Sequence, residues 1–283
     1  MISWFVMLAL AAEPTYAKPE LLIDGPTLVK QAAKVHILDA RPKKDYDKGH
    51  IPGAVHVPVE TWAKAMAGRP DEAAWAKTLG QFGLRPDRPI VVVGTPRTVD
   101  AARVWWILRF WGFEQVRLLD GGLPAYVAAG GKQSTEAPKV EVTKPELRKQ
   151  TQRLATKDEI LEGLKKGDLG PLVDARSEGE HCGTDVKAKR GGSIPEAKHL
   201  EWTATLDKDG KFKSAAELQK LFKEVGIDPT KPATTYCQSG GRAAVMAFAL
   251  ELVGGKPARN YYGSWSEWGN DEKTPIVKPR KEK

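Results

Sequence analysis

Short apolar or β-branched runs bounded by turn residues recur along the chain. They are Val35–Leu38, Ile90–Val93, Val116–Leu119, Leu172–Val173 and Thr234–Tyr236. Such runs are typical of strands in a parallel sheet that is covered on both faces. Helical stretches alternate with them, and we expect the aromatic residues of one stretch to lie in the core: Trp105, Trp106, Phe110 and Trp111. The alternation predicts an α/β fold, in which sites form at the carboxyl ends of strands.

The same succession of motifs occurs twice. The first copy reads ILDAR at 37–41, GHIPGAVHVP at 49–58, VVVGT at 91–95 and VRLLDGGLPAY at 116–126. The second reads LVDAR at 172–176, GGSIPEAKHLEW at 191–202, TTYCQ at 234–238 and ARNYYGSWSEW at 258–268. The offset rises from 135 residues at Asp39 and Asp174 to 143 at Ile51 and Ile194, so the second copy has an insertion, which contains Gly183 to Arg190. A long repeat in matched order indicates a duplicated domain.

The duplication predicts one domain at 18–132, a polar linker at 133–153 and a second domain at 154–283. Residues 1–17 are expected to be a signal peptide, because an apolar run ends in Ala9-Leu10-Ala11, which fits the small-residue rule for cleavage. The run lacks a basic segment before it, and a buried N-terminal strand or helix is the alternative. A signal peptide would make the protein periplasmic or secreted, whereas the alternative location is the cytoplasm.

Composition excludes several classes of protein. Hydrophobic residues make up 41% and charged residues 28% of 283 residues, which excludes a disordered or collagen-like chain. No run approaches the ~18 consecutive apolar residues of a membrane span. The formal net charge is +8, but no nucleic-acid-binding motif is present, so we interpret the charge as suited to a small anionic substrate. The spacing of Cys182 and Cys237 matches no zinc-binding pattern. The two cysteines could form one disulfide, or either could be a reactive thiol.

Cys237 carries the candidate chemistry. It follows a predicted strand and precedes Gln238-Ser239-Gly240-Gly241-Arg242 and an Ala-rich helix. Adjacent glycines permit a tight loop whose N–H groups turn inward, and the helix adds the positive end of its dipole. Such a loop stabilises a thiolate and makes it nucleophilic. The alternative is a buried structural cysteine.

The motifs DAR, GHIPGAVH, YCQSGGRAA and GSWSEW, repeated over residues ~20–275, resemble those of the two-domain rhodanese sulfurtransferases. The resemblance implies two tandem rhodanese-like domains, each a central parallel sheet flanked by helices. It also implies that the second domain is active and that Cys237 becomes a persulfide. The first copy has Thr95 in the cysteine register, and a hydroxyl cannot carry a persulfide, so we expect the first domain to be catalytically silent.

The candidate site consists of Cys237 and the residues around it. The expected substrate-binding residues are Gln238, Ser239, Gly240, Gly241, Arg242, Arg176 and Lys189, and Asp174 is expected to orient the site. Thiosulfate-type members of the family often carry basic residues where this chain has Gln238 and Ser239. Arg242 could bind the donor or pair with a carboxylate that holds the loop. Arg176 has a counterpart in the silent half, so a structural role is the alternative. Glu180 stands where the family tends to have arginine, and we expect it to repel an anionic donor unless Lys187, Lys189 and Arg190 compensate. Trp265 and Trp268 are expected to serve packing.

These features predict a sulfurtransferase that moves a sulfane sulfur from thiosulfate to cyanide or a thiol, without a metal or cofactor. Transfer from 3-mercaptopyruvate is one alternative, and a non-enzymatic sulfur-carrier or binding module is another. Four residues separate Cys237 from Arg242, whereas cysteine-dependent phosphatases have five, so a phosphatase is disfavoured. We expect a monomer that binds no nucleic acid. In an oxidising compartment, a Cys182–Cys237 disulfide could form a resting or regulatory state.

Overall fold

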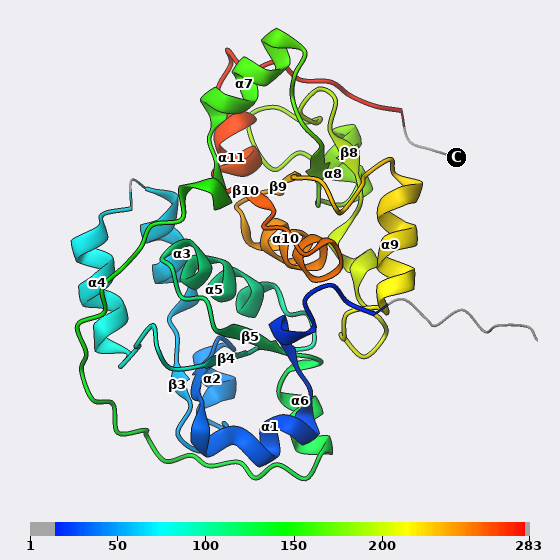
Figure 1. The fold of residues 1–283 in the computed structure, drawn as a ribbon. Coiled ribbons are helices and arrows are strands. Elements are labelled where there is room, and N and C mark those ends of the chain that lie inside the picture. The colour runs from blue at the N-terminus through cyan, green and yellow to red at the C-terminus, as the bar shows by residue number, and fades with distance from the viewer. Residues whose placement is uncertain (1–14, 69, 281–283) are drawn as a thin grey trace, which may run out of the picture.

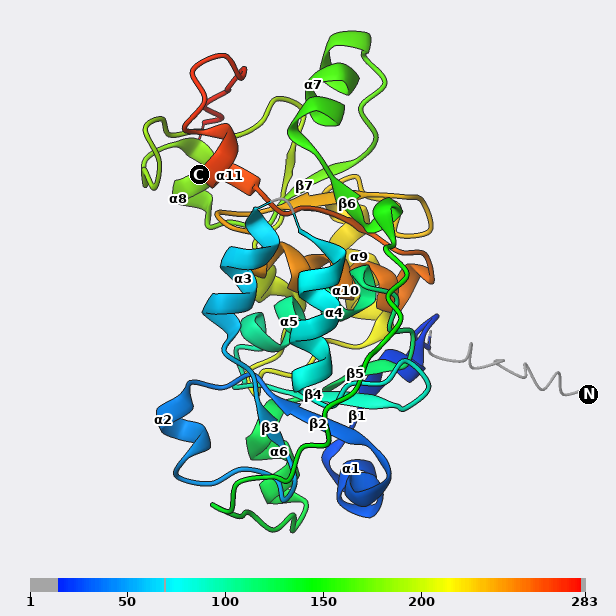
Figure 2. The ribbon, with the colours of Figure 1, turned by 90° about the vertical axis from the view of Figure 1, so that its left-hand side faces the viewer.

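The computed structural model describes residues 15–68 and 70–280, which form two stacked α/β halves (Figures 1 and 2). The strands of the first half are β1 (Leu22–Ile23), β2 (His36–Asp39), β3 (Val55–His56), β4 (Ile90–Val93) and β5 (Val116–Leu119). Its helices are η1 (Pro19–Leu21), α1 (Gly25–Gln31), η2 (Ala32–Lys34), α2 (Lys43–Tyr46), α3 (Val59–Ala67), α4 (Glu72–Gln81), α5 (Val99–Phe110) and α6 (Gly122–Ala128).

The second half repeats this succession. Its strands are β6 (Leu154–Ala155), β7 (Leu172–Asp174), β8 (Lys198–His199), β9 (Thr234–Tyr236) and β10 (Arg259–Tyr261). Its helices are η3 (Thr151–Arg153), α7 (Lys157–Lys166), α8 (Glu178–Cys182), η4 (Trp202–Thr205), α9 (Ala215–Glu224), α10 (Gly241–Gly254) and α11 (Ser264–Trp268). The strand orders, β1-β5-β4-β2-β3 and β6-β10-β9-β7-β8, are equivalent. All neighbouring strands in the two sheets are parallel, which confirms the predicted α/β fold.

Side-chain caps fix where several helices of the second half begin. Thr156 and Ser214 start α7 and α9 with a capping box. In each box the hydroxyl accepts from the N–H of the third helical residue, and the carboxylate of that residue, a glutamate, accepts from the main-chain N–H of the cap. Ser177 starts α8 in the same way, and its glutamate partner is Glu180. Each box satisfies N–H groups that have no acceptor within the helix. The cap of α8 therefore fixes the position of the Glu180 carboxylate.

Helices α5 and α10 form the contact between the two halves, as Figure 1 shows. The ring of Trp105 packs edge-on against Phe248 at 4.8 Å. Helix α10 is buried almost throughout because its own sheet covers one face and α5 covers another. The prediction that the aromatic residues of α5 and its end lie in the core is confirmed, since none of the four is more than 1% exposed. The hydrophobic core is thus continuous across the boundary.

Glu251 is a charged residue within this apolar helix, and it is fully buried. Its carboxylate accepts from Arg153 at 2.7 and 3.2 Å and from Arg109 of the first half at 3.2 Å. The ammonium group of Lys18 lies 3.5 Å away. Burial raises the pKa of Glu251, but Arg153 and the other two cations outweigh burial and lower it below the ordinary value. One buried carboxylate therefore joins three separate segments of the chain.

The connection between the halves runs along the outside of the first half, past α4 (Figure 1). Residues 135–150 have no helix or strand, although Thr143 donates its N–H to Gly80 O at 3.0 Å. Most of the expected signal peptide lies outside the described residues. Tyr16 lies within the described part, and its hydroxyl donates to Lys213 O at 2.7 Å. The packed chain thus reaches back at least to Tyr16.

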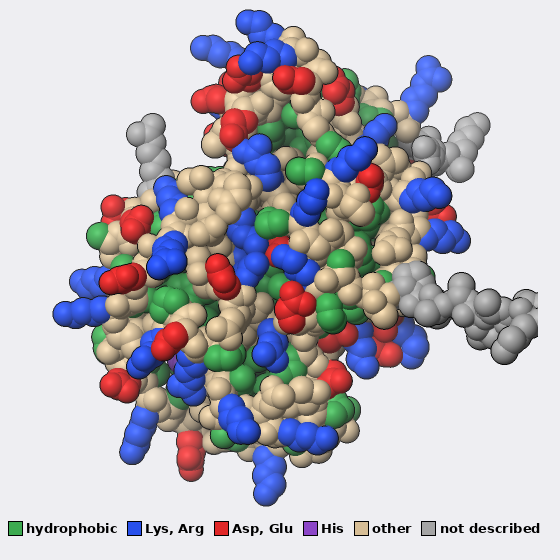
Figure 3. All heavy atoms as spheres, in the orientation of Figure 1, with side chains coloured by type: hydrophobic (Ala, Val, Ile, Leu, Met, Phe, Trp, Pro, Cys, Tyr) green, Lys and Arg blue, Asp and Glu red, His purple; other side chains and the backbone are tan. Residues whose placement is uncertain are grey.

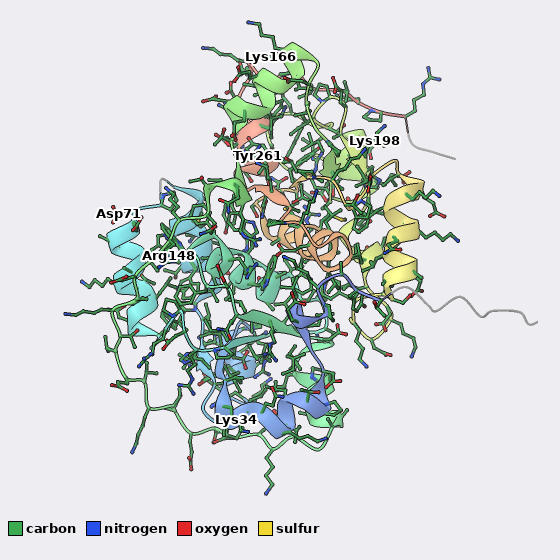
Figure 4. The ribbon with its side chains drawn as sticks, viewed as in Figure 1. Lys34, Asp71, Arg148, Lys166, Lys198 and Tyr261 are labelled. Carbon is green, nitrogen blue, oxygen red and sulfur yellow. The ribbon has the colours of Figure 1, made fainter. Side chains whose placement is uncertain are left out.

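Charged side chains are distributed over both halves on the face seen in Figure 3, where acidic groups lie among the basic ones. Lys34 and Lys166 lie at opposite ends of the molecule and are exposed (Figure 4). The net positive charge is therefore spread out on this face. Within residues 15–68 and 70–280, no helix combines the length and apolar character that crossing a membrane requires.

Candidate active site

Cys237 lies directly after β9, at the carboxyl end of the second sheet, and is 1% exposed. The loop continues for three residues to the first turn of α10. Its last residue, Gly240, has a φ of 82°, and a Cβ there would lie 2.8 Å from the ring of Tyr262. Only glycine combines this left-handed backbone with so close an approach. The loop therefore turns sharply enough to place the helix N-terminus beside the sulfur.

The main-chain N–H groups of the loop are not used by the hydrogen bonds of the described structure. Among the described residues, none accepts a hydrogen bond from the N–H groups of residues 238–241. The carbonyl oxygens of the loop are bonded by residues outside it, including the N–H groups of Trp265, Ser266 and Asn260, at 2.9 Å each. Unpaired amides before a helix N-terminus form an anion-binding cradle. This cradle can stabilise negative charge on a sulfur attached to Cys237.

Ser264 supports the loop from beneath. The N–H of Cys237 donates to Ser264 Oγ at 3.1 Å, and the hydroxyl donates onward to Tyr261 O at 2.7 Å. Ser264 has a φ of 53°, a left-handed conformation that costs a non-glycine residue of order 1 kcal/mol or more. Both hydrogen bonds are fully buried and offset this strain. The strained turn at the start of α11 therefore fixes the main chain of the cysteine.

Arg242 and Glu180 form a two-pronged ion pair at the loop, with N–O distances of 2.6 and 2.8 Å. Glu180 also accepts from the N–H and hydroxyl of Ser177. Burial lowers the pKa of Arg242, but Glu180 and the sulfur of Cys237 outweigh burial and raise it. The guanidinium group thus lies between the carboxylate and the cysteine. The sequence led us to expect that Glu180 repels an anionic donor unless the cations of the insertion compensate, but its carboxylate is paired with Arg242.

The insertion of the second copy borders the loop. Gln238 Nε2 donates to Lys187 O at 3.1 Å and contacts Ser266 Oγ at 3.3 Å. The ammonium group of Lys187 lies 2.9 Å from Asp185. The side chain of Lys189 is exposed, so its role in binding substrate stays a prediction. The insertion contributes a main-chain acceptor that fixes Gln238.

Arg103 reaches the loop from α5 of the first half. Its Nη1 donates to Ser239 O at 2.7 Å and to the hydroxyl of Tyr262 at 2.8 Å. The guanidinium carbon also lies 5.5 Å from the centre of the Tyr262 ring. Because Arg103 bonds the Ser239 carbonyl from outside, it favours the loop conformation in which the amides stay free. The first half therefore contributes a residue to the candidate site.

Asp174 and Arg176 form a buried pair beneath the loop, with bonds of 2.9 and 2.6 Å. Arg176 also donates to Gly192 O, and Tyr236 and His181 bond the Asp174 carboxylate. Burial raises the pKa of Asp174, but His181 and Arg176 outweigh burial and hold it well below the ordinary value. Through Tyr236, these contacts join the end of β7 to the end of β9, the strand that Cys237 follows.

The first half contains the same pair of residues, Asp39 and Arg41. Arg41 bonds Asp39 and donates to Gly49 O at 2.8 Å, as its counterpart does in the second half. Arg176 is 1% exposed. A pair that recurs without a cysteine stabilises the fold, and this favours a structural role for Arg176 over the substrate-binding role.

The remaining sequence predictions concern sulfur, metal and packing. Cys182 and Cys237 are not joined by a disulfide. Among the described residues, no group of His, Cys, Asp and Glu could hold a metal ion. Trp265 and Trp268 are at most 1% exposed, and their indole N–H groups donate to the main chain, so the prediction that they serve packing is confirmed.

Three contributors to the site could not be read from the sequence. Ser264 belongs to the GSWSEW motif, but only its left-handed backbone shows that its hydroxyl faces the cysteine. Tyr262 belongs to the second copy and looks like a core residue. Arg103 lies in a largely apolar helix of the other half, and its basic side chain in that run was the available signal.

The fold and the loop define a class: duplicated α/β proteins with a cysteine in a loop that joins a strand to a helix N-terminus in the second domain. The model of the rhodanese-like domain matches residues 27–129 and 156–271. The chain belongs to the rhodanese family and is a sulfurtransferase. The match in both halves confirms the resemblance inferred from the repeated motifs.

Relatives of similar length support this assignment. The sulfur carrier protein TtuD of Thermus thermophilus is 33% identical, over 93% of this chain and 98% of its own. A thiosulfate sulfurtransferase of Corynebacterium glutamicum is 33% identical, over 92% and 91%. One of Pseudomonas aeruginosa is 32% identical, over 97% and 99%. A solved structure of the anaerobic ergothioneine biosynthesis enzyme from Chlorobium limicola has a TM-score of 0.83 at 23% identity, over 92% of this chain and 70% of that one, and shares the fold.

Proposed function

We propose that the protein transfers the outer sulfur of thiosulfate to a thiol or to cyanide through a persulfide on Cys237. The observation that carries this proposal is the loop in which Cys237 faces unpaired main-chain amides at a helix N-terminus. Two relatives named thiosulfate sulfurtransferase, at 32 and 33% identity, support thiosulfate as the donor.

The reaction has two displacement steps. The Cys237 thiolate attacks the outer sulfur of thiosulfate, a new S–S bond forms, and sulfite leaves with both electrons of the bond that breaks. The negative charge then lies on the terminal sulfur of the persulfide, where the loop amides stabilise it. Cyanide or a thiolate next attacks that sulfur, and the Cys237 thiolate leaves.

Mass spectrometry of the intact protein tests the proposal. Incubation with thiosulfate should add about 32 Da, the mass of one sulfur. Cys237→Ser should abolish the gain, whereas the matched variant Cys182→Ser should keep it. A protein that gains no mass from thiosulfate, 3-mercaptopyruvate or a thiosulfonate is not a sulfurtransferase of this kind.

A second candidate is a sulfur carrier, because a relative at 33% identity carries that name. A carrier would form the Cys237 persulfide from a protein donor, yet thiosulfate and cyanide would give no turnover. Turnover of 3-mercaptopyruvate with cyanide would instead identify that donor. Thiocyanate formation with each donor separates these functions.

We also propose that residues 1–17 direct export and that the mature protein is a monomer in the periplasm or outside the cell. The contacts of Tyr16 favour cleavage before that residue, so the removed segment would end nearer the Ala9-Leu10-Ala11 motif than residue 17, the expected end. N-terminal sequencing of the protein from its native compartment tests the cleavage. An uncleaved N-terminus in cytoplasmic protein would contradict export.

A further inference from the structure

A cation beside Cys237 is neutralised before any donor arrives. Arg242 interacts with the Cys237 sulfur, and both of its terminal nitrogens bond the Glu180 carboxylate. Glu180 is 4% exposed, and the cap of α8 fixes it in this position. A bidentate pair of this kind has no net charge, and the N–H groups of Arg242 that could bind an anionic donor side by side are already bonded to Glu180.

Two further cations near the loop bond groups of the protein. Lys187 is paired with Asp185. Arg103 uses its Nη1 on Ser239 O and Tyr262, and Asp100 lies one turn earlier on the same face of α5. The loop side chains Gln238 and Ser239 are neutral. A dianion that enters the loop therefore meets the amides, while the charge of Arg242 is already neutralised by Glu180.

We propose that Glu180 sets the charge preference of the donor site, so that the site is matched to singly charged sulfane-sulfur donors, such as organic thiosulfonates and persulfides, over doubly charged thiosulfate. This inference rests on the proposed function. Glu180 does not touch the reacting sulfur, and it acts through Arg242 as a specificity-determining residue. Thiosulfate remains a substrate, but one that binds weakly.

Thiosulfate and methanethiosulfonate test this preference because they undergo the same step with different charges. In each, the thiolate of Cys237 attacks the outer sulfur and the S–S bond breaks. Sulfite leaves thiosulfate, and methanesulfinate leaves methanethiosulfonate, in both cases with the bonding electron pair. Either product is the same anionic persulfide, so the comparison isolates the donor charge.

Glu180→Gln removes the negative charge and releases Arg242. Coulomb energy is proportional to the donor charge, so a fold-change for a monoanion is squared for a dianion. We expect KM to fall about threefold for methanethiosulfonate and about tenfold for thiosulfate. The matched control is Glu178→Gln on the same helix, since Glu178 lines a separate cavity with Lys198, and it should leave both values unchanged.

Two further variants keep the inference testable if Glu180→Gln does not fold. Arg242→Gln leaves Glu180 unpaired and should raise KM more for thiosulfate than for methanethiosulfonate. The double variant with Glu180→Gln and Arg242→Gln is neutral, like the native pair, and should restore the native ratio of the two KM values. Equal changes for both donors, or a double variant with an altered ratio, would overturn the inference. If neither donor forms a persulfide on Cys237, it is the proposed function that fails.

Discussion

Replacing Glu251 by Gln tests whether one buried carboxylate joins the two halves. Glutamine has nearly the same shape but no charge, so Arg153, Arg109 and Lys18 lose their only shared anion. The side chains of the two arginines are 5 and 11% exposed, and water therefore replaces the carboxylate poorly.

The magnitude follows from this burial. Breaking a buried ion pair by removing one partner costs about 3–5 kcal/mol, and because the amide oxygen still accepts hydrogen bonds we expect about 3 kcal/mol. The matched control is Glu162→Gln, which breaks the exposed pair with Lys166 and should change stability by less than about 0.5 kcal/mol.

The pH dependence has a definite sign. The pKa of Glu251 is lower in the folded protein than its ordinary value of 4.5, because the three cations outweigh burial. A lowered pKa stabilises the folded state above the unfolded pKa, and this stabilisation is lost as the pH falls through the folded pKa. The difference between native protein and Glu251→Gln should therefore be complete at neutral pH and shrink below about pH 4.5.

Urea denaturation followed by tryptophan fluorescence measures the effect, because Trp105 lies at the contact between the halves. The native protein should unfold with the halves coupled, and Glu251→Gln should unfold at lower urea, with an earlier phase in which the halves separate. If Glu251→Gln lost less than about 1 kcal/mol, or if the loss were the same at pH 3 and pH 7, the ionised carboxylate would not be the link.

Other substitutions test the support of the site. Arg103→Ala should lower kcat about tenfold or more with little change in KM. Added guanidinium ion should restore part of the rate. An unchanged kcat would show that the first half does not position the loop. Ser264→Gly relieves the backbone strain but removes the hydroxyl under Cys237, so persulfide formation should slow while stability falls by no more than about 1 kcal/mol. Tyr236→Phe leaves the Asp174 carboxylate with one donor fewer and should cost about 1–3 kcal/mol in denaturation, without altering the donor preference.

Much of the fold could be predicted because buried parallel strands leave a clear apolar pattern. The predicted runs at Ile90–Val93, Val116–Leu119 and Thr234–Tyr236 coincide with β4, β5 and β9. The edge strand Leu22–Ile23 has only two residues, too few to show a recognisable pattern of apolar and polar positions. Arg259–Tyr261 is an inner strand but reads RNY, since its side chains serve hydrogen bonds as well as packing.

The sequence predicted those parts of the candidate site whose residues follow one another along the chain. The loop from Cys237 to Arg242 is contiguous, so its role could be inferred from glycine and helix patterns. The consequence of Glu180 could not, because repulsion or neutralisation depends on whether a cation lies within hydrogen-bonding distance. Arg103 was hidden for a related reason: no local pattern tells which face of α5 meets the other half.

The burial of α10 makes the second half dependent on the first. A fragment that began at residue 154 would expose the apolar side of α10 that α5 now covers, together with a Glu251 that has lost Lys18, Arg109 and Arg153. Such a fragment would associate with another copy of itself or aggregate. The second half on its own is therefore a poor substitute for the full chain, although it contains Cys237 and its loop.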